Sequence, residues 1–370
     1  MKICLYNVTS TMDLPGTHEV GGTEEFSFRV AEAWQRMGHE VVIVGGEPKP
    51  GASTRQTPVP LKLFPYLETA GIPNLGSRFR KLIQRIHFSR RALKYVKSEA
   101  FELVLAFKPY DLPPFWLAGL SKRARVLFRF GGTDFFPTDR FWSGAANACF
   151  ANSRSTADKV QERYHRGCAV IGNGAIVPER AAVIDERVQT VLSAGRLTGW
   201  KGFGTLIEAA SPLRNRKGWK LVIAGEGEYR PKLEAVIEEF GLKEKVELPG
   251  RMPAKEIQDL MRQGALYVQP STGYDSCPNA VMDAMAAGLP VVISSEVGTP
   301  EGFEPGRHGL VFPAGNQQAL FEQMIRFLNH PADFARMGEA GRKLVQERFT
   351  LDKIAWEILE LAKSHVRDRA

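Results

Sequence analysis

Short apolar runs alternate with amphipathic stretches from the first residues onward, a pattern that predicts strands alternating with helices. KICLYNV (2–8) and EVVIVGG (40–46) are predicted as buried strands, and Gly38 ends the helix between them. This order implies parallel strands joined by a right-handed crossover. The apolar positions that form one face of that helix are Phe26, Val30, Ala33, Trp34 and Met37.

The rest of the N-terminal half contains further apolar runs of strand length, which predicts a doubly wound α/β domain. Residues 47–76 are rich in Pro, Gly and Thr and are predicted as a surface excursion near a binding site. The apolar runs are FELVLAF (101–107), RVLFRF (125–130), ACFANS (148–153) and CAVIGNG (168–174).

The same alternation restarts after about residue 180 and predicts a second α/β domain. Gly241, Gly264 and Gly288 follow predicted helix ends, where a left-handed residue is favoured. The predicted strands are VQTVLSAG, WKLVIAG, KVELPG, ALYVQPS and PVVISS, and the predicted helices are 203–210, 229–240, 254–263 and 278–287.

A length of 370 residues also favours two domains, because a single core rarely grows that large. We place the first domain at 1–177 and the second at 178–349, and expect the last helix, within 350–370, to pack back on the first. In such folds ligands bind at the carboxyl ends of the parallel strands, so the expected site is a cleft between two sheets.

The composition is that of a soluble globular protein, with 44% hydrophobic and 24% charged residues. No apolar stretch approaches the ~20 residues that span a bilayer, and MKICLYNVTS does not resemble a signal peptide. The four cysteines are scattered without a CxxC pair, which predicts free thiols in a reducing cytosol and argues against structural zinc. We therefore expect a cytoplasmic protein.

The positive charge is concentrated in the first half. Residues 1–180 hold 25 Lys and Arg against 16 Asp and Glu, whereas 181–370 hold 24 against 25. Residues 77–97 carry eight Lys and Arg and no acid, and their apolar residues recur at helical spacing, which predicts a basic amphipathic helix. This helix could present a solvated face, bind an anionic membrane surface, or contact a nucleic acid or an anionic acceptor.

Three glycine-containing turns follow predicted strands and open helices: GGTEEF (21–26), GRLTGWKG (195–202) and AGEGE (224–228). None matches the dinucleotide fingerprint or the phosphate loop, which disfavours a nicotinamide-dependent oxidoreductase. In GRLTGWKG, Arg196 and Lys201 leave the end of a strand, and a forked guanidinium with a point charge suits a diphosphate. The alternative is that both are ordinary surface charges on a loop.

The stretch GYDSCPNAVMDAMAAG (273–288) places an acid on each side of a helix start. Pro278 suits the first helical turn, whose N–H groups attract an anion. Asp283 lies about one turn further in and can accept hydrogen bonds from the two hydroxyls of a ribose, while Asp275 precedes the helix, where a second hydroxylated group could bind. Both acids also have ordinary explanations, as a loop residue and as a helix-surface residue.

Several of these segments, in this order, resemble retaining glycosyltransferases of family 4. The resemblance covers nearly the whole chain, is strongest over 190–312, and implies a GT-B fold of two Rossmann-like domains. It also implies a nucleotide-sugar donor held mainly by the second domain, and no essential metal or other cofactor. The segments are VGGTEEFSFRVAEAWQRMGHEVVIV, SAGRLTGWKGFGTLIEAA, LVIAGEGEYRPKLE, VELPGRMPAKEI and PSTGYDSCPNAVMDAMAAGLPVV.

The resemblance assigns roles to individual residues of this sequence. It implies that Arg196 and Lys201 bind the diphosphate, Asp275 the donor sugar and Asp283 the ribose, so that Asp275, Arg196 and Lys201 are the catalytic candidates. The remaining donor-side candidates are Gly22 near the phosphates, Arg251 and Met252 near the base, Cys277, Pro278, Asn279 and Ala280 at the helix start, and Glu301 on the nucleotide side.

The sequence departs from the family pattern at two places. The paired acids, usually glutamates, are Asp275 and Asp283, each one methylene shorter. The histidine that commonly follows a first-domain strand is replaced by Gly131 in RFGGTDFF, which leaves Arg129 and Asp134 as polar candidates on the acceptor side. His18 and His39 are poor substitutes for it.

These observations and the resemblance predict a retaining glycosyltransferase that uses a UDP- or GDP-sugar and acts on a carbohydrate or lipid-linked acceptor, with residues 77–97 as the segment that could dock it on an anionic membrane. The two departures support the alternative of a sugar-nucleotide-binding module with impaired catalysis. An RNA-binding protein would suit the sequence pI of 9.3, but no aromatic and basic motif of the known modules is present, so no nucleic-acid partner is expected.

Overall fold

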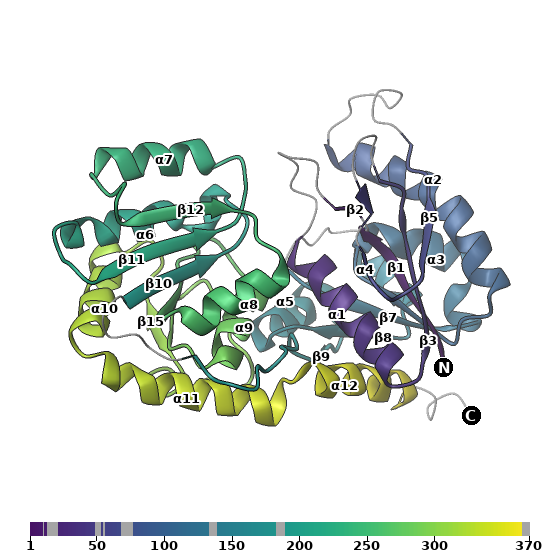
Figure 1. Cartoon of the computed structure of the whole chain (residues 1–370). Coiled ribbons are helices and arrows are strands. Elements are labelled where there is room, and N and C mark those ends of the chain that lie inside the picture. Colours follow the sequence, from purple (N-terminus) through teal and green to yellow (C-terminus); the bar gives the residue numbers. More distant parts are fainter. Residues whose placement is uncertain are drawn as a thin grey trace. The chain divides into compact units, whose positions relative to one another are not determined.

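The computed structural model describes residues 1–9, 11–12, 21–48, 53–54, 56–67, 77–132, 139–182 and 189–364, which form two compact units (Figure 1). Unit 1 is Met1–Gly172 together with Leu351–Ala370, and unit 2 is Asn173–Thr350. The first division lies a few residues before the one expected from the sequence, at 177, and the second falls one residue after 349.

Unit 1 is built on a seven-stranded sheet in which every neighbouring pair of strands is parallel. The strand order reverses direction between β1 and β6, as in a doubly wound Rossmann-like sheet. In sheet order, the strands are β5 (Leu61–Phe64), β3 (Glu40–Gly46), β1 (Lys2–Thr9), β6 (Leu103–Ala106), β7 (Arg125–Phe130), β8 (Ala148–Ala151) and β9 (Ala169–Val170).

Helices connect these strands, and a small antiparallel pair, β2 (Thr11–Met12) with β4 (Ser53–Thr54), stands apart from the sheet. Residues 47–76 were expected to be a surface excursion, but they contain the edge strand β5, because LKLF extends the sheet beside β3. The helices of unit 1 are α1 (Gly22–Arg36), α2 (Ser77–Ser98), α3 (Leu112–Ala118), α4 (Asp139–Trp142), α5 (Arg154–Tyr164) and α12 (Leu351–Ser364).

The last helix, α12, packs on α1 within unit 1. Trp34 of α1 is fully buried, and its indole N–H donates a hydrogen bond of 2.8 Å to the carbonyl of Ala355. At the surface, Arg36 pairs with Asp352 at 2.9 Å. The apolar residues of α12 thus pack in unit 1, although the helix follows unit 2 in the sequence.

The basic segment forms the helix α2, as predicted, and it is amphipathic over its described side chains. Leu93 and Val96 are buried, whereas Lys94 and Lys97 are exposed. Ile86, expected on the apolar face, is instead exposed, and the side chain of Leu82 lies outside the described residues. Among the helices that the structure describes, none combines the length and the apolar character that crossing a bilayer requires.

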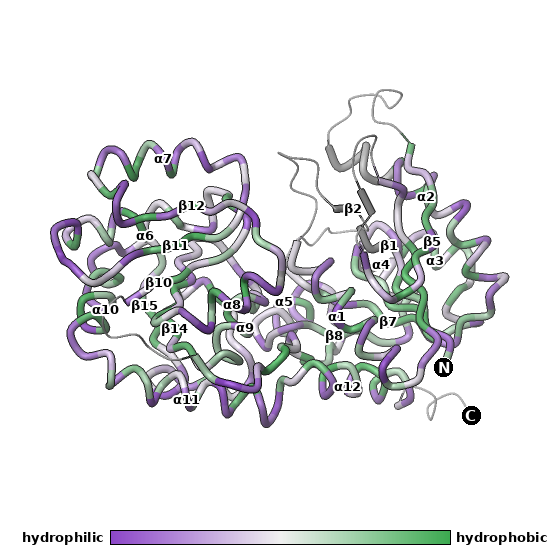
Figure 2. The backbone as a smooth tube through the Cα atoms, in the orientation of Figure 1, coloured by the Kyte–Doolittle hydropathy of each residue, from purple (hydrophilic) through white to green (hydrophobic). Residues whose placement is uncertain are grey.

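Unit 2 contains a six-stranded parallel sheet whose strand order also reverses at one point, between β10 and β13. Its central strands β10, β11, β13 and β14 are largely buried and mostly apolar, and Figure 2 shows green stretches of chain inside more polar helices. In sheet order, the strands are β12 (Val246–Gly250), β11 (Trp219–Ala224), β10 (Gln189–Ala194), β13 (Leu266–Gln269), β14 (Val291–Ser294) and β15 (Leu310–Phe312).

The helices of unit 2 end largely as the glycine positions predict. Gly241 and Gly288 adopt the left-handed conformation with φ of 66° and 85°. Gly264 does not; it is extended, and a Cβ there would lie 2.3 Å from Leu192, so close packing explains this glycine. The helices are α6 (Phe203–Ala210), α7 (Arg230–Glu239), α8 (Ala254–Gln263), α9 (Asn279–Ala287), α10 (Gln317–Asn329) and α11 (Pro331–Arg348).

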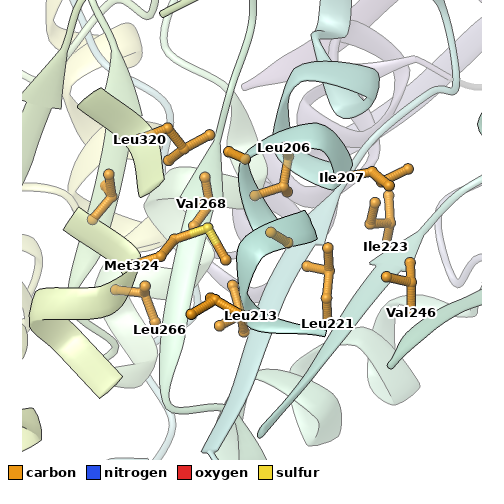
Figure 3. Close-up of a cluster of buried hydrophobic side chains, with 14 of the residues drawn as sticks. Leu206, Ile207, Leu213, Leu221, Ile223, Val246, Leu266, Val268, Leu320 and Met324 are labelled. Atoms are coloured by element: carbon orange, nitrogen blue, oxygen red, sulfur yellow. The ribbon is translucent and has the colours of Figure 1, made fainter. Parts of the chain in front are cut away.

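The core of unit 2 lies between the sheet and the helices α6 and α10 (Figure 3). Four of its side chains are fully buried: Leu206 and Ile207 of α6, Leu221 of β11 and Val268 of β13. Met324 of α10 fills the space beside these branched side chains, as a flexible thioether does well. This core holds the ends of β10 and β13 in fixed register, which matters for the site described below.

Replacing the buried indole of Trp34 tests the docking of α12 on α1. We expect Trp34→Ala to lower the free energy of unfolding of unit 1 by about 3–5 kcal/mol, because it opens a cavity and removes a buried hydrogen bond. The control is Trp356→Ala on α12, whose side chain is 56% exposed and which should change stability by less than about 0.5 kcal/mol. Urea unfolding with hydrogen exchange measures both; equal effects would contradict the packing.

Candidate functional site

The strand reversal in unit 2 brings two loops together at the carboxyl edge of its sheet. β10 and β13 are hydrogen-bonded neighbours, with Val191 opposite Leu266. The loop after β10 carries Lys201, and the loop after β13 carries Asp275. Connections diverge from such a point in opposite directions, which leaves room for a ligand above the strand ends.

Glycines allow these loops to pack backbone against backbone. Gly202, at φ of 70°, follows a short 3₁₀ turn, η5 (Gly199–Lys201), and a Cβ there would lie 1.9 Å from the carbonyl oxygen of Pro270. A Cβ at Gly225 would lie 1.8 Å from the carbonyl oxygen of Gly195. The amides of Thr272 and Gly273 both donate to the carbonyl of Trp200, at 2.8 and 3.2 Å. The two loops are therefore fixed to each other.

Lys201 and Asp275 form an ion pair at the meeting point of the loops. The ammonium Nζ lies 2.6 Å from Oδ2 of Asp275, and the two side chains are only 12% and 10% exposed. Nζ also lies 4.6 Å from the centroid of the Trp200 ring. A pair held this far from water needs further hydrogen bonds to balance the cost of desolvation.

Those hydrogen bonds come from a row of polar side chains along β13 and the residues after it. Ser271 Oγ donates to Asp275 Oδ2 at 2.8 Å, and Gln269 Nε2 lies 3.4 Å from the same oxygen. The Tyr267 hydroxyl donates to Gln269 Oε1 at 2.8 Å and lies 3.2 Å from the carbonyl oxygen of Ala194 on β10. Burial raises the pKa of Tyr267, which keeps it a neutral donor.

The backbone of Asp275 is anchored as firmly as its side chain. Its N–H donates to the carbonyl of Glu296 at 2.9 Å, and its carbonyl accepts from Gly298 at 2.7 Å and from Cys277 at 2.9 Å. Cys277 has a φ of 58°, unusual for a non-glycine residue. The Asn173 side chain, itself buried, donates to the Cys277 carbonyl at 2.8 Å and supports this turn.

The helix α9 begins directly after this turn. Pro278 stands at its N-cap rather than in its first turn as predicted, and the carbonyl of Pro278 accepts from Val281 at 3.1 Å. The first N–H groups of any helix have no acceptor within the helix, so its start attracts an anion. Asn279 and Ala280 lie in this first turn, and Asp283, 8% exposed, follows in the second.

The other predicted residues of unit 2 lie on loops around the same sheet edge. Arg196 follows β10 and is exposed, while Arg251 and Met252 follow β12. Glu301 lies in the loop after β14, where its carboxylate is 3.6 Å from the Arg348 guanidinium. The structure thus joins Lys201 and Asp275 directly and leaves Arg196, Arg251 and Glu301 at the periphery.

In unit 1, a partly buried Glu24–Lys108 ion pair lies near the point where the strand order reverses, between β1 and β6. Gly22 is the first residue of α1, and the Gly21 amide donates to Glu24 Oε2 at 3.1 Å. Lys108, which follows β6, donates to the other oxygen of Glu24 at 2.9 Å. Burial raises the pKa of Glu24, but the Lys108 charge and these hydrogen bonds outweigh it and lower that pKa overall.

Arg129 and Gly131 lie beside the start of α1. Arg129 is buried, and its guanidinium lies 4.1 Å from the centroid of the Phe26 ring. A Cβ at Gly131 would lie 2.6 Å from Nη1 of Arg129 and 3.4 Å from the hydroxyl of Thr23. The guanidinium therefore occupies the space where a side chain at 131 would begin. Asp134 and His18 lie outside the described residues.

Sequence reasoning missed the supporting residues of the site. Tyr267, Gln269 and Ser271 alternate along ALYVQPS, so a period-two row of polar residues at a strand end was the available signal. Asn173 and the Glu24–Lys108 pair gave no local signal, since each depends on contacts distant in sequence. Among the residues that the structure describes, no group of three or more His, Cys, Asp or Glu side chains could hold a metal ion.

Two family models match successive parts of the chain. Residues 20–176 match the model described as Glycosyltransferase Family 4, and residues 179–344 match Glycosyl transferases group 1. The two matches correspond closely to the two predicted domains.

The curated relatives align with less than half of the chain in the two examples that follow. The amylovoran biosynthesis glycosyltransferase AmsK of Erwinia amylovora is 34% identical over 165 residues, covering 43% of this chain and 40% of that protein. The putative colanic acid biosynthesis glycosyltransferase WcaL of Escherichia coli is 30% identical over 181 residues, covering 47% and 45%. The chain thus spans less than half the length of these relatives.

Solved structures match the whole chain at low identity. Sucrose-phosphate synthase from Thermosynechococcus elongatus has a TM-score of 0.83 at 20% identity and covers 99% of each chain. HepE from Anabaena, in complex with UDP-glucose, has a TM-score of 0.77 at 19% identity and covers 98% of this chain and 100% of that one. With the two parallel-sheet units, these similarities show the GT-B fold that the sequence predicted.

The close approach at Gly202 can be tested by adding one methyl group. We expect Gly202→Ala to lower the free energy of unfolding by about 2–5 kcal/mol. The alanine would have to adopt the left-handed conformation, and its Cβ would overlap the backbone of Pro270. Gly241→Ala is the matched control, because its φ of 66° is similar and a Cβ there meets nothing within 4 Å; it should cost about 1–2 kcal/mol. Urea unfolding measures both, and equal costs would show that the loops can separate.

Proposed function

Both halves of the chain match glycosyltransferase families, and on that premise we propose that the protein is a retaining glycosyltransferase. It transfers a sugar from a UDP- or GDP-sugar to a hydroxyl of a carbohydrate or lipid-linked precursor of a cell-envelope polysaccharide. The names of the relatives, which refer to amylovoran and colanic acid biosynthesis, support the acceptor class. The HepE structures with UDP and with UDP-glucose support the donor class.

The observation that carries the proposal is the Lys201–Asp275 pair beside the start of α9. Lys201 and Arg196 bind the diphosphate together with the first-turn amides of α9, where the helix dipole favours negative charge. Asp275 accepts hydrogen bonds from donor sugar hydroxyls, and Asp283 accepts them from the ribose. The ion pair holds Lys201 ready for the diphosphate, so little reorganisation is needed when the donor binds.

The remaining donor contacts surround this centre. Arg251 and Met252, after β12, contact the base, and Glu301 lies on the nucleotide side. Gly22, at the start of α1 in unit 1, contributes backbone near the phosphates. The turn before α9 adds Cys277 to the contacts already described.

The mechanism follows from where charge develops. As the bond from the anomeric carbon to the phosphate oxygen breaks, negative charge grows on the diphosphate and positive charge on the sugar ring. Lys201, Arg196 and the α9 dipole stabilise the departing diphosphate, so the reaction needs no metal ion. The acceptor hydroxyl attacks from the leaving-group face and the phosphate oxygen takes its proton, which retains the configuration.

Unit 1 supplies the acceptor side in this proposal, through Arg129, Gly131 and Asp134. The Arg129 guanidinium fills the space at Gly131 that a larger side chain would need. A buried cation stands there in place of the imidazole that the family commonly has. This departure also favours a second candidate, a sugar-nucleotide-binding module with impaired catalysis.

We place the protein in the cytoplasm, peripherally bound to the inner face of the membrane through α2. Arg90, Arg91, Lys94 and Lys97 are exposed on that helix, which suits anionic lipid headgroups. The neighbouring helix α3 exposes large apolar side chains, Trp116 at 56% and Leu117 at 76%, which can enter the interface. Basic and apolar groups on adjacent helices are the combination that such docking needs.

A thermal-shift panel of UDP-, GDP- and ADP-sugars tests the donor. One nucleotide class should raise Tm in a concentration-dependent manner, since a ligand that binds only the folded state stabilises it. Asp283→Ala should then raise Kd for that nucleotide by roughly 10- to 100-fold, because the ribose would lose its hydrogen bonds to a charged carboxylate. Asp275→Asn should slow transfer by roughly 100-fold.

The control for both variants is Asp259→Ala, an exposed acid of α8 paired with Arg262, which should change neither value. No stabilisation by any sugar nucleotide would refute the donor assignment. Donor binding without transfer or slow donor hydrolysis across a broad acceptor panel would select the binding module instead.

Membrane docking is tested with vesicles that contain phosphatidylglycerol. Lys94→Gln/Lys97→Gln should lower the partition coefficient roughly 30-fold, at about 1 kcal/mol for each lysine near an anionic surface. Lys217→Gln/Lys255→Gln, exposed lysines of unit 2, should have little effect. Cosedimentation measures both, and binding that is equal for vesicles of phosphatidylcholine alone would exclude this role for α2.

A further inference from the structure

The fold of unit 1 brings two cysteines from separate segments together at the edge of its sheet. β8 and β9 run parallel with Phe150 opposite Ala169, so Cys149 and Cys168, one residue earlier on each segment, face each other. Both pack on the same side of the sheet, in the unit 1 core. Facing residues on neighbouring strands are about 4.8 Å apart at Cα, within the range that a disulfide bridges.

The surroundings of the pair suit thiol chemistry. Cys149 Sγ donates a hydrogen bond of 3.3 Å to the carbonyl of Gly167. The neighbouring Cys168 and the Arg166 charge lower the pKa of Cys149 despite its burial, whereas Cys149 and burial raise the pKa of Cys168. Arg166 is held in place by the carbonyls of Ser143 and Ala146. Cys149 is buried, whereas Cys168 is partly exposed, so a reagent can reach one sulfur and the other can respond.

The other two cysteines differ from this pair in their surroundings. Cys4 is fully buried in β1, and burial raises the pKa of its thiol. Cys277 is 1% exposed in the turn before α9. Neither combines an accessible sulfur with a second thiol beside it, as a reactive pair does.

We propose that Cys149 and Cys168 are a thiol–disulfide modification site, which low-molecular-weight disulfides such as oxidised glutathione convert to a reversible intramolecular disulfide. Cys168 gives up its proton as it attacks one sulfur of the reagent, which forms a mixed disulfide and releases one glutathione thiolate. The Cys149 thiolate then attacks Cys168 Sγ and releases the second. Two protein thiols are oxidised, one glutathione disulfide is reduced to two thiols, and the two protons pass to the glutathione thiolates.

The bond has a defined structural consequence. It closes a ring that contains α5 and ties the short edge strand β9 to β8 covalently. Cross-linking restricts the unfolded chain, so the oxidised protein should melt at a higher temperature than the reduced one. The site does not depend on the proposed transfer reaction, so the two can fail separately.

The experiment incubates the full chain with excess oxidised glutathione and counts free thiols after denaturation. The wild type should lose two of its four thiols, carry no glutathione adduct, and yield a Cys149–Cys168 peptide by mass spectrometry. Dithiothreitol should restore all four thiols and the lower Tm.

Two variants resolve the steps. Cys149→Ala should stop at one stable glutathione adduct on Cys168, because no neighbouring thiolate remains to displace it. Cys168→Ala should keep its three thiols, because the buried Cys149 is out of reach. The wild type decides the matter even if a variant fails to fold: four retained thiols, a persistent adduct or a disulfide between two chains would each overturn the proposal.

Discussion

The site in unit 2 depends on one buried ion pair, Lys201 with Asp275, at the point where the strand order reverses. Neither charge could remain in so dry a place alone, because an unpaired buried ion costs several kcal/mol. The surrounding sequence serves this requirement. Ser271 and Gln269 add hydrogen bonds to the same carboxylate oxygen, and Gly202 lets the lysine loop approach the aspartate loop.

The same pair explains how the site can be rigid without a ligand and still ready for one. In the proposed function, a diphosphate would offer Lys201 more negative charge than one carboxylate does, and sugar hydroxyls would offer Asp275 new donors. The donor would then replace the ion pair while the backbone of this loop stays anchored through Glu296, Gly298 and Asn173.

In unit 1 the structure gives a physical reason for an unexpected glycine. The resemblance of the sequence led us to expect a histidine at the position of Gly131, and the Arg129 head group occupies the space beside this glycine. Arg129 is held by the ring of Phe26, from the first turns of α1. A larger side chain at 131 would compete with the Arg129 guanidinium for the same space, so the two residues depend on each other.

Most of the elements and their parallel order could be predicted from the sequence, because apolar periodicity and helix-ending glycines are local signals. Asp275, Asp283 and Lys201 could be selected in this way, since each stands at a fixed distance from a strand or helix end. Which groups meet could be seen only in the folded chain. The extended Gly264, the edge strand β5 and the Cys149–Cys168 pair all depend on strand register and close packing. Those contacts join residues far apart in the chain, and no local pattern encodes them.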